Sequence, residues 1–495
     1  MPSCRLIVKD EVNIKVEGLA IETRRKIVNK LKYELPYARH MPAYKLGRWD
    51  GTKTFFGIGG GGFLAHVDII LPIIENDGYD VVLEDHRRPQ PKFNFPVVDE
   101  NYWANQGKTW PQGHPNAGEL IVLRDYQYDV VNKFLENPQS LQEVATGAGK
   151  TITTATLSHL CEPYGRTIVI VPNKSLVVQT EEDYRNLGLD VGVYFGDRKE
   201  LNKTHTICTW QSLNILDKKS YDDDDVLSLA EFTDGVCAII IDEVHQAKAE
   251  VLMRLATQNF KHCPIRWGLT GTIPKEEWEF QSLLASIGPV IGHVSAHDLQ
   301  EKGVLANLEI NILQTNDVEV FRNFQEEYTW LVTDEKRLTW IAGKVYELSQ
   351  LSDGAANTLI LINRIDTGNR LLTILKEKYL INATFISGAV KLDDRKEEYD
   401  EVKTSDNKII VATYGVAAVG INIPRIFNLV LIEPGKSFVR VIQSIGRGIR
   451  KAEDKDFVQI WDITSTCKYA KRHLTERKKY YKDAKYPFTV TKVTI

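Results

Sequence analysis

The chain has 495 residues, a length that suits about three domains, and its 43% apolar and 26% charged residues are typical of a globular protein. The net charge of −4 excludes a uniformly basic nucleic-acid binder, so any such binding must use local patches. The six cysteines are scattered and form no Cys-x-x-Cys pair, which argues against disulfides and a metal site. No run of about 18 apolar residues occurs, so we expect no membrane span. Both observations favour a soluble, cytoplasmic protein.

The first block of the chain covers residues 1–115. Short β-like runs alternate there with one charged helical stretch at 21–35, and the glycines at 57–62 indicate a turn between strands. Proline-rich stretches at 86–91 and 110–115 disfavour regular structure. We therefore expect a small α+β accessory domain over residues 1–115 that ends in an interdomain connection.

Two α/β blocks follow, at residues 116–305 and 306–495. Each contains continuous apolar runs, which are typical of strands buried on both faces of a parallel sheet covered by helices. These runs stand at 167–171 and 236–241, and then at 358–362, 408–412 and 428–432. Because a phosphate loop occurs in the first block alone, we expect one ATP site in a cleft between two lobes.

The phosphate loop reads Ala-Thr-Gly-Ala-Gly-Lys-Thr at residues 145–151. Its glycines allow successive backbone N–H groups to point at one anion, Lys150 can reach the β- and γ-phosphates, and the Thr151 hydroxyl can bind Mg²⁺. The loop residues expected to contact ATP are Thr146, Gly147, Ala148, Gly149, Lys150 and Thr151. Upstream, the Gln127 amide can read the adenine edge, although most glutamines are ordinary surface residues.

An acidic pair follows the apolar run that ends at residue 241. We expect Asp242 to hold Mg²⁺ and Glu243 to orient and deprotonate the water that attacks the γ-phosphate. Thr270 and Thr272, at the end of a later apolar run, carry hydroxyls that can couple the acidic pair to changes on hydrolysis. The alternative for the acidic pair is an exposed Asp-Glu at a strand end, which the upstream loop makes less favourable. Taken alone, the stretch with Thr270 and Thr272 could also be an ordinary turn.

Residues 443–450 read Gln-Ser-Ile-Gly-Arg-Gly-Ile-Arg, which places Arg447 and Arg450 on one helical face. Phosphoryl transfer spreads negative charge over the equatorial oxygens, and arginines from a second lobe can stabilise it. A solvated face is the alternative, but the preceding Gly-Ile-Asn-Ile-Pro at 420–424 favours the catalytic interpretation.

The order of these motifs resembles a superfamily-two helicase over about residues 120–465. The resemblance implies two RecA-like lobes, ATP in the cleft and a nucleic-acid strand across both. It also implies that Gly420 and Asn422 lie at the nucleotide and that His245 and Gln443 take part in coupling. His245 replaces the last Asp of DEAD-box RNA helicases and favours DNA translocases of the DExH kind. Asn422 stands where many relatives carry Asp, so it offers a carbonyl without a charge.

The accessory block contains Gly-Arg-Trp-Asp-Gly at residues 47–51, and with this motif it resembles the accessory domain of phage UvsW-type branch-migration helicases. The closing stretch 488–493 is similar to that subfamily too. This narrower resemblance implies an ATP-dependent helicase that acts on single-stranded and branched DNA in phage replication, recombination or repair, in the host cytoplasm. An RNA helicase and an ATP-gated binding module without unwinding stay open as alternatives, and the sequence does not indicate an oligomeric state.

A translocase needs contacts to phosphates, which carry no sequence information. Candidates at predicted strand ends are Lys174, Thr209 and Gln211 in the first lobe and Arg364 and Thr413 in the second. Each also fits a loop or a helix cap. In the accessory block, Arg48 and Trp49 fit either a duplex-contacting loop or a core anchored by the tryptophan.

The tail at residues 468–492 contains nine Lys or Arg residues against Glu476 and Asp483, with four tyrosines among them. Basic groups can follow a phosphate backbone while tyrosine rings stack on bases, each for about 1–3 kcal/mol. Alternatively, the tyrosines pack on the second lobe and the charges face solvent. The sequence favours neither interpretation.

Overall fold

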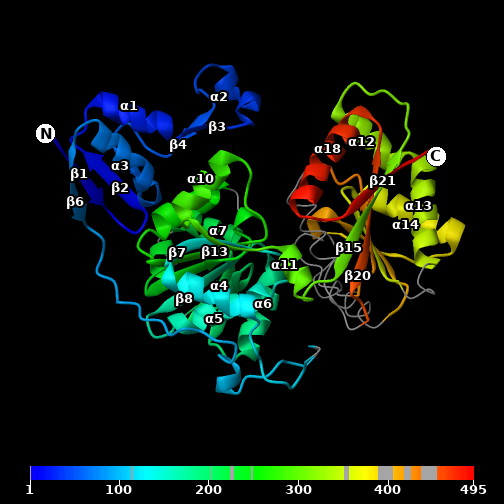
Figure 1. Ribbon diagram of the computed structural model, residues 1–495, viewed down its shortest axis with the longest axis horizontal. Helices are drawn as coiled ribbons and strands as arrows, with labels where there is room; N and C mark the ends of the chain where they lie inside the picture. The colour runs from blue at the N-terminus through cyan, green and yellow to red at the C-terminus, as the bar shows by residue number, and fades with distance from the viewer. Residues whose placement is uncertain are drawn as a thin grey trace. The chain divides into compact units, whose positions relative to one another are not determined.

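The computed structural model describes residues 2–112, 114, 116–201, 203–222, 228–246, 249–350, 356–387, 405–416, 425–435 and 454–495 (Figure 1). Two compact units divide the chain: Met1–Val144 with Gly149–His293, and Ala145–Ala148 with Val294–Ile495. The accessory block and the first lobe therefore share one unit, and their division near residue 115 stays a prediction. None of the helices that the structure describes combines the length and apolarity needed to cross a bilayer.

The accessory part is built on a four-stranded sheet in the order β5-β2-β1-β6. Its strands are β1 (Ser3–Val8), β2 (Asn13–Glu17), β5 (Gly61–Phe63) and β6 (Asp80–Asp85), and its helices are α1 (Ile21–Lys30) and α3 (Val67–Asn76). Ile27, Ile70 and Ile74 are fully buried in the core that these helices share with the sheet. In the turn before β5, Gly60 has φ +89° and a Cβ there would lie 2.2 Å from the Val16 carbonyl oxygen, so only glycine fits.

A small hairpin follows α1. It consists of β3 (Lys32–Glu34) and β4 (Thr52–Thr54), with the short helix α2 (Pro42–Lys45) between them. The predicted helical stretch at 21–35 is therefore too long, because Leu31 is fully buried at the helix end and the next three residues pair with β4. Tertiary pairing outweighs the helical pattern here.

The connection predicted after the accessory sheet is irregular and lies against the first lobe. Phe93 and Phe95 stack on each other and both contact the Tyr164 ring. Trp103 is fully buried, and its indole N–H donates to the Thr156 hydroxyl over 2.9 Å. These aromatic contacts attach the connection to the lobe.

The first lobe contains an eight-stranded sheet in the order β10-β9-β11-β8-β12-β13-β7-β14. Its strands are β7 (Gln139–Val144), β8 (Arg166–Val171), β9 (Val191–Phe195), β10 (Arg198–Lys199), β11 (His205–Thr209), β12 (Val236–Ile241), β13 (Ile265–Thr270) and β14 (Val290–Val294). Its helices are α4 (Asp125–Glu136), α5 (Lys150–Cys161), α6 (Lys174–Asn186), α7 (Trp210–Asp222), α8 (Leu229–Phe232), α9 (Ala249–Arg254) and α10 (Glu277–Ser286). The predicted runs at 167–171 and 236–241 form the neighbouring parallel strands β8 and β12, which confirms the α/β prediction.

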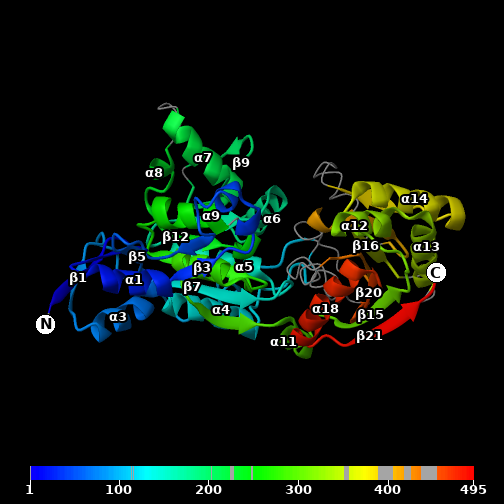
Figure 2. The same ribbon diagram turned by 90° about the horizontal axis from the view of Figure 1, so that it is seen from above.

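The second lobe is a seven-stranded sheet in the order β17-β18-β16-β19-β20-β15-β21, in which every pair is parallel. Its strands are β15 (Asn307–Thr315), β16 (Thr358–Ile362), β17 (Thr384–Ile386), β18 (Ile409–Thr413), β19 (Asn428–Ile432), β20 (Phe457–Ser465) and β21 (Phe488–Val493). The helices described in the second unit are α11 (Ala296–Glu301), which precedes the predicted lobe boundary at 305, and α12 (Phe324–Thr333), α13 (Glu335–Gln350), α14 (Ile365–Tyr379) and α18 (Lys468–Asp483). Successive residues of β20 point to opposite faces of the sheet. Ile463 packs with α13 and α14 on one face, and Asp462 accepts a hydrogen bond from α18 on the other (Figure 2).

The carboxyl ends of parallel strands meet at one edge of a sheet, which is where such folds place ligands. In the first lobe this edge carries the phosphate loop after β7 and Asp242 after β12. In the second lobe it carries the residues that follow β15, β16, β19 and β20. The two RecA-like lobes therefore each present one functional edge.

Candidate active site

The phosphate loop joins β7 to α5, as its sequence predicts. Gly147 and Gly149 have φ of +91° and +80°, a backbone region that favours glycine. A Cβ on Gly149 would lie 2.6 Å from Gln127 Nε2, so the glycine also allows that side chain to approach the loop. Because α5 begins at Lys150, its free N–H groups face the position that an anion would take.

The predicted acids lie next to the loop lysine. Lys150 Nζ forms an ion pair with Glu243 Oε1 and lies 3.9 Å from Asp242 Oδ1. The Lys150 and Glu243 side chains are 9% and 6% exposed, so this pair is shielded from solvent. Glu243 has φ +49°, an uncommon value for a residue with a side chain, and such strain is frequent at functional positions.

The protonation states of Glu243 and His245 follow from their surroundings. Burial raises the pKa of Glu243, but the charge of Lys150 and a hydrogen bond from the Gly271 N–H over 3.1 Å outweigh it and lower the pKa to about 2. Burial lowers the pKa of His245 to about 4. At neutral pH the glutamate is therefore ionised and the imidazole is neutral.

The coupling residues predicted after the acids form a hydrogen-bonded chain. Thr270 Oγ1 donates to the Thr272 carbonyl oxygen over 2.8 Å and lies 2.5 Å from His245 Nδ1. With the single hydroxyl hydrogen directed at the Thr272 carbonyl, the His245 tautomer that carries its hydrogen on Nδ1 completes the contact by donating to Thr270. These bonds join His245, two residues after Glu243, to the end of β13. The Gly271 N–H bond to Glu243 links the acidic pair itself to this strand end, and the sequence did not indicate it.

Gln127 lies beside the phosphate loop and is 7% exposed. Its amide oxygen accepts from the Arg124 N–H over 3.0 Å, which caps the start of α4, and its amide nitrogen is next to Gly149. The cap explains its position, and a contact with adenine stays a prediction. Sequence reasoning passed over Arg124, whose backbone fixes this amide.

Asp242 and Thr151 offer a carboxylate and a hydroxyl, the hard oxygen ligands that Mg²⁺ prefers. The described residues contain no group of three or more acidic, histidine or cysteine side chains that could hold a metal. Mg²⁺ commonly uses one or two carboxylates together with substrate phosphates, so the two residues fit this ion. The predicted residues Gly420, Asn422, Gln443, Arg447 and Arg450 lie outside the described residues.

The nucleic-acid candidates of the first unit have different surroundings. Lys174 begins α6 after β8, and Gln211 is exposed at the start of α7. Thr209 is buried, and its Oγ1 accepts from the Ser212 N–H over 3.2 Å, which favours the interpretation as a helix cap. Arg48 is exposed, whereas Trp49 is half-buried and its indole N–H donates to the Thr52 carbonyl oxygen over 2.9 Å.

In the second unit, Arg364 stands at the start of α14 and Thr413 is half-buried at the end of β18. The Arg364 guanidinium donates to Thr329 Oγ1 over 3.0 Å and lies 5.2 Å from the centre of the Tyr328 ring. In the basic tail, Tyr481 and Tyr486 are buried, so these two tyrosines follow the packing interpretation.

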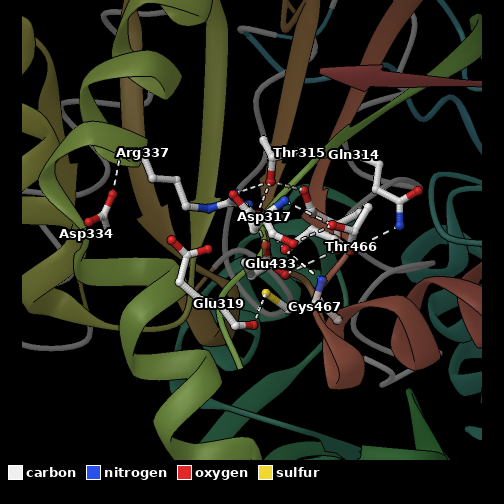
Figure 3. A network of polar contacts seen from close by, with 12 residues as sticks. Gln314, Thr315, Asp317, Glu319, Asp334, Arg337, Glu433, Thr466 and Cys467 are labelled. Atoms are coloured by element: carbon white, nitrogen blue, oxygen red, sulfur yellow. Dashed lines mark hydrogen bonds and ion pairs between the residues drawn. The ribbon is translucent and has the colours of Figure 1, made fainter. Parts of the chain in front are cut away.

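A buried ion network in the second unit was not predicted (Figure 3). Arg337, which is fully buried on α13, bonds to Glu433 Oε1 over 2.7 Å and to Asp317 Oδ2 over 3.1 Å. Burial raises the pKa of Glu433 to about 7, against the opposing charge of Arg337. Glu433 also has φ +42° directly after β19, so the network holds a strained position at the functional edge.

Comparisons with known proteins agree with this geometry. Residues 120–275 match the family described as "Type III restriction enzyme, res subunit", and residues 343–452 match "Helicase conserved C-terminal domain". The chain is 23% identical over 465 residues to "ATP-dependent DNA helicase uvsW" of Enterobacteria phage T4, covering 90% of this chain and 88% of that protein. It is 27% identical over 406 residues to "Putative DNA 3'-5' helicase Rad25" of Haloarcula marismortui, covering 76% and 60%.

Among solved structures, a fragment of a putative HsdR subunit of a type I restriction enzyme from Vibrio vulnificus YJ016 is similar, with a TM-score of 0.56 at 18% identity. The likeness covers 81% of this chain and 72% of that one. At this identity it shows the fold of the two lobes.

Proposed function

We propose that this chain, which belongs to the superfamily-two helicases of the DExH kind and is an ATP-hydrolysing DNA helicase, acts on branched DNA such as forks and four-way junctions. The observation that supports its motor chemistry best is the buried pair of Lys150 and Glu243, joined through Gly271 to the end of β13. The branched substrate rests on the resemblance of residues 47–51 and 488–493 to phage branch-migration helicases, and a DNA helicase of a phage matches over 90% of the chain.

In the proposed reaction, the phosphate loop binds ATP with Lys150 at the β- and γ-phosphates. Thr151 and Asp242 hold Mg²⁺, which neutralises phosphate charge when bound. Once Lys150 contacts the phosphates, its direct ion pair with Glu243 weakens. The pKa of Glu243 then rises from its low value. Glu243 then becomes a better base for the attacking water.

The hydrogen bonds among His245, Thr270 and Thr272 connect the segment that carries the acids to the end of β13. A change at the acids on hydrolysis can therefore reach the rest of the lobe. We assign Arg447 and Arg450 to the developing charge on the phosphates and Gln443 to coupling, with Gly420 and Asn422 at the nucleotide. Opening and closing of the lobes over each ATP cycle alternates the grip of the two strand edges and moves the DNA strand.

The proposed division of labour has three parts. Residues 1–115 form an accessory domain that contacts duplex DNA through Arg48 and Trp49. Residues 116–305 and 306–495 are the ATP-binding lobe and the C-terminal helicase lobe. We place the activity in phage replication, recombination or repair, in the cytoplasm of the host cell.

A branch-migration assay tests the substrate. The full chain, with ATP and Mg²⁺, is given a synthetic four-way junction and, in parallel, a simple fork. We expect ATP-dependent conversion of both, and no conversion by Lys150→Ala. Hydrolysis stimulated by RNA but not by DNA would support the RNA-helicase alternative, and stimulated hydrolysis without strand displacement would support a gated binding module.

A further inference from the structure

Four rings gather at the functional edge of the second lobe, in a cluster that we call the aromatic platform: Phe324, Tyr328, Tyr469 and His473. The Phe324 ring lies at its centre. Ring centres are 5.6 Å apart for Phe324 and Tyr328, 6.0 Å for Phe324 and Tyr469, and 5.2 Å for Phe324 and His473. The first two residues belong to α12 and the other two to α18, which lie side by side (Figure 1).

The sheet brings these two helices together. Strands β15 and β20 pair along nine residues, so their carboxyl ends are adjacent, and α12 and α18 follow them. Glu327, which is 2% exposed, accepts hydrogen bonds from the backbone N–H groups of Tyr469 at 2.9 Å and Ala470 at 2.7 Å. A buried carboxylate from α12 thus fixes the start of α18 and sets the rings relative to each other.

The centre of the platform is open to solvent, whereas Tyr328, Tyr469 and His473 are half-buried around it. Phe324 is 41% exposed although three rings surround it, and Val318 and Val320 in the preceding loop are 88% and 95% exposed. A small depression lined by Phe324, Tyr328 and His473 reaches Gly435, which follows β19. The apolar surface therefore borders the edge at which RecA-like lobes meet their ligands.

Basic groups flank the rings. Arg364 lies over Tyr328, and Lys468 Nζ lies 5.4 Å from the centre of the Tyr469 ring. Arg322, Lys471 and Arg472 are exposed nearby on the same segments: 316–324 and α18. Of the acids on 316–324 and α12, Glu327 is buried in its cap and Asp317 pairs with Arg337. Glu319 and Glu326 are exposed and accept hydrogen bonds from the Val318 N–H and the Asn323 amide within their own turns. One exposed ring among half-buried rings, flanked by cations, is suited to a polyanion with stacking faces.

We propose that the aromatic platform stacks bases of a single DNA strand while Arg364 and Lys468 contact its phosphates. Stacking is tolerant of sequence because every base has a π-face, which suits a translocase. The inference rests on the proposed function and adds a base contact to a strand path otherwise expected to use phosphates alone. Of the four tail tyrosines, it gives this role to Tyr469.

The test compares two ligands and two matched variants. Binding of the full chain to fluorescent oligothymidine and to an abasic oligonucleotide of equal length is measured over a range of salt concentrations. Phe324→Ala removes the central ring of the platform. Phe457→Ala is the control, since Phe457 is a phenylalanine of nearly equal exposure, 42%, at the opposite, amino end of β20.

The unmodified chain should bind oligothymidine about 5- to 100-fold more tightly than the abasic strand. Phe324→Ala should lose most of that preference and keep the salt dependence, whereas Arg364→Ala should reduce the salt dependence and keep the preference. Phe457→Ala should bind like the unmodified chain. Equal binding of both ligands by the unmodified chain, or an unchanged preference in Phe324→Ala, would overturn the platform. Failure of any DNA to stimulate hydrolysis would instead contradict the proposed function.

Discussion

At the scale of single residues, the Lys150–Glu243 pair shows how one contact can serve two states. The buried lysine holds the pKa of Glu243 low, so the carboxylate stays ionised near neutral pH. The same lysine is the group that binds phosphate in loops of this kind. Because contact with a phosphate would draw Lys150 away from its direct ion pair with Glu243, nucleotide binding and activation of the proposed base would be linked through this lysine.

Glu243→Gln should therefore bind ATP at least as tightly as the unmodified chain and lose about 10²- to 10⁴-fold in hydrolysis rate. Glutamine keeps an oxygen for the Gly271 N–H but cannot take a proton, and it frees Lys150 from an ionic partner. Lys150→Ala should lose ATP hydrolysis altogether. Nucleotide affinity and steady-state hydrolysis are measured with Glu136→Gln, an exposed glutamate at the end of α4, as control. Hydrolysis at the normal rate by Glu243→Gln would exclude it as the base.

At the scale of elements, local pattern predicted what is locally determined. The strands β8, β12, β16, β18 and β19 coincide with apolar runs, since both faces of each are buried. The loop before α5 follows from its glycines, and the acids lie at the end of β12 because parallel strands deliver them there.

Long-range pairing was not predictable from the same patterns. The tail residues 488–493 form an edge strand parallel to β15, which lies far earlier in the chain. Tyr481 is buried, and its hydroxyl donates to Asp462. Arg337 and its partner Glu433 are 96 positions apart, with no spacing to connect them. The site was thus predictable where one segment carries it, and the network that supports the second edge was not.

Arg337→Leu should destabilise the second unit by about 3–5 kcal/mol, because Glu433 and Asp317 would be left buried without their cation. The loss should grow as pH rises. The folded-state pKa of Glu433 is already raised to about 7, so the fold holds its proton more tightly than the unfolded chain. The stability that Glu433 contributes is therefore present at low pH and declines as the pH rises from the ordinary pKa of a glutamate to about 7. Removal of Arg337 makes that decline steeper and extends it to higher pH.

Urea unfolding at pH 6 and pH 8 measures this effect. Arg370→Leu is the matched control, since Arg370 pairs with Asp366 on the surface of α14, where both side chains are more than half exposed. The control should change stability by less than about 1 kcal/mol at either pH. Equal losses for the two variants would show that the buried network does not carry the expected charge.

At the scale of the whole molecule, the proposed chemistry needs both lobes. In the proposed mechanism the first lobe contributes the loop, Lys150 and the acids, which would bind the triphosphate and activate water. Charge that develops on the transferred phosphoryl group requires further cations, which helicases of this kind are expected to take from the second lobe. Arg447 and Arg450 are the candidates that we propose in this chain, and in that role they would make ATP hydrolysis depend on closure of the lobes.

Arg450→Ala should consequently lower the rate of hydrolysis at saturating ATP by about 10³-fold or more while affinity for ATP changes little. Arg370→Ala, on the exposed surface of the same lobe, should hydrolyse ATP normally. DNA-stimulated hydrolysis and nucleotide affinity are measured together, because loss of affinity with normal turnover would place Arg450 in ground-state binding. If DNA still raised the rate of Arg450→Ala to that of the unmodified chain, closure of the second lobe on the phosphates would have to act through other residues.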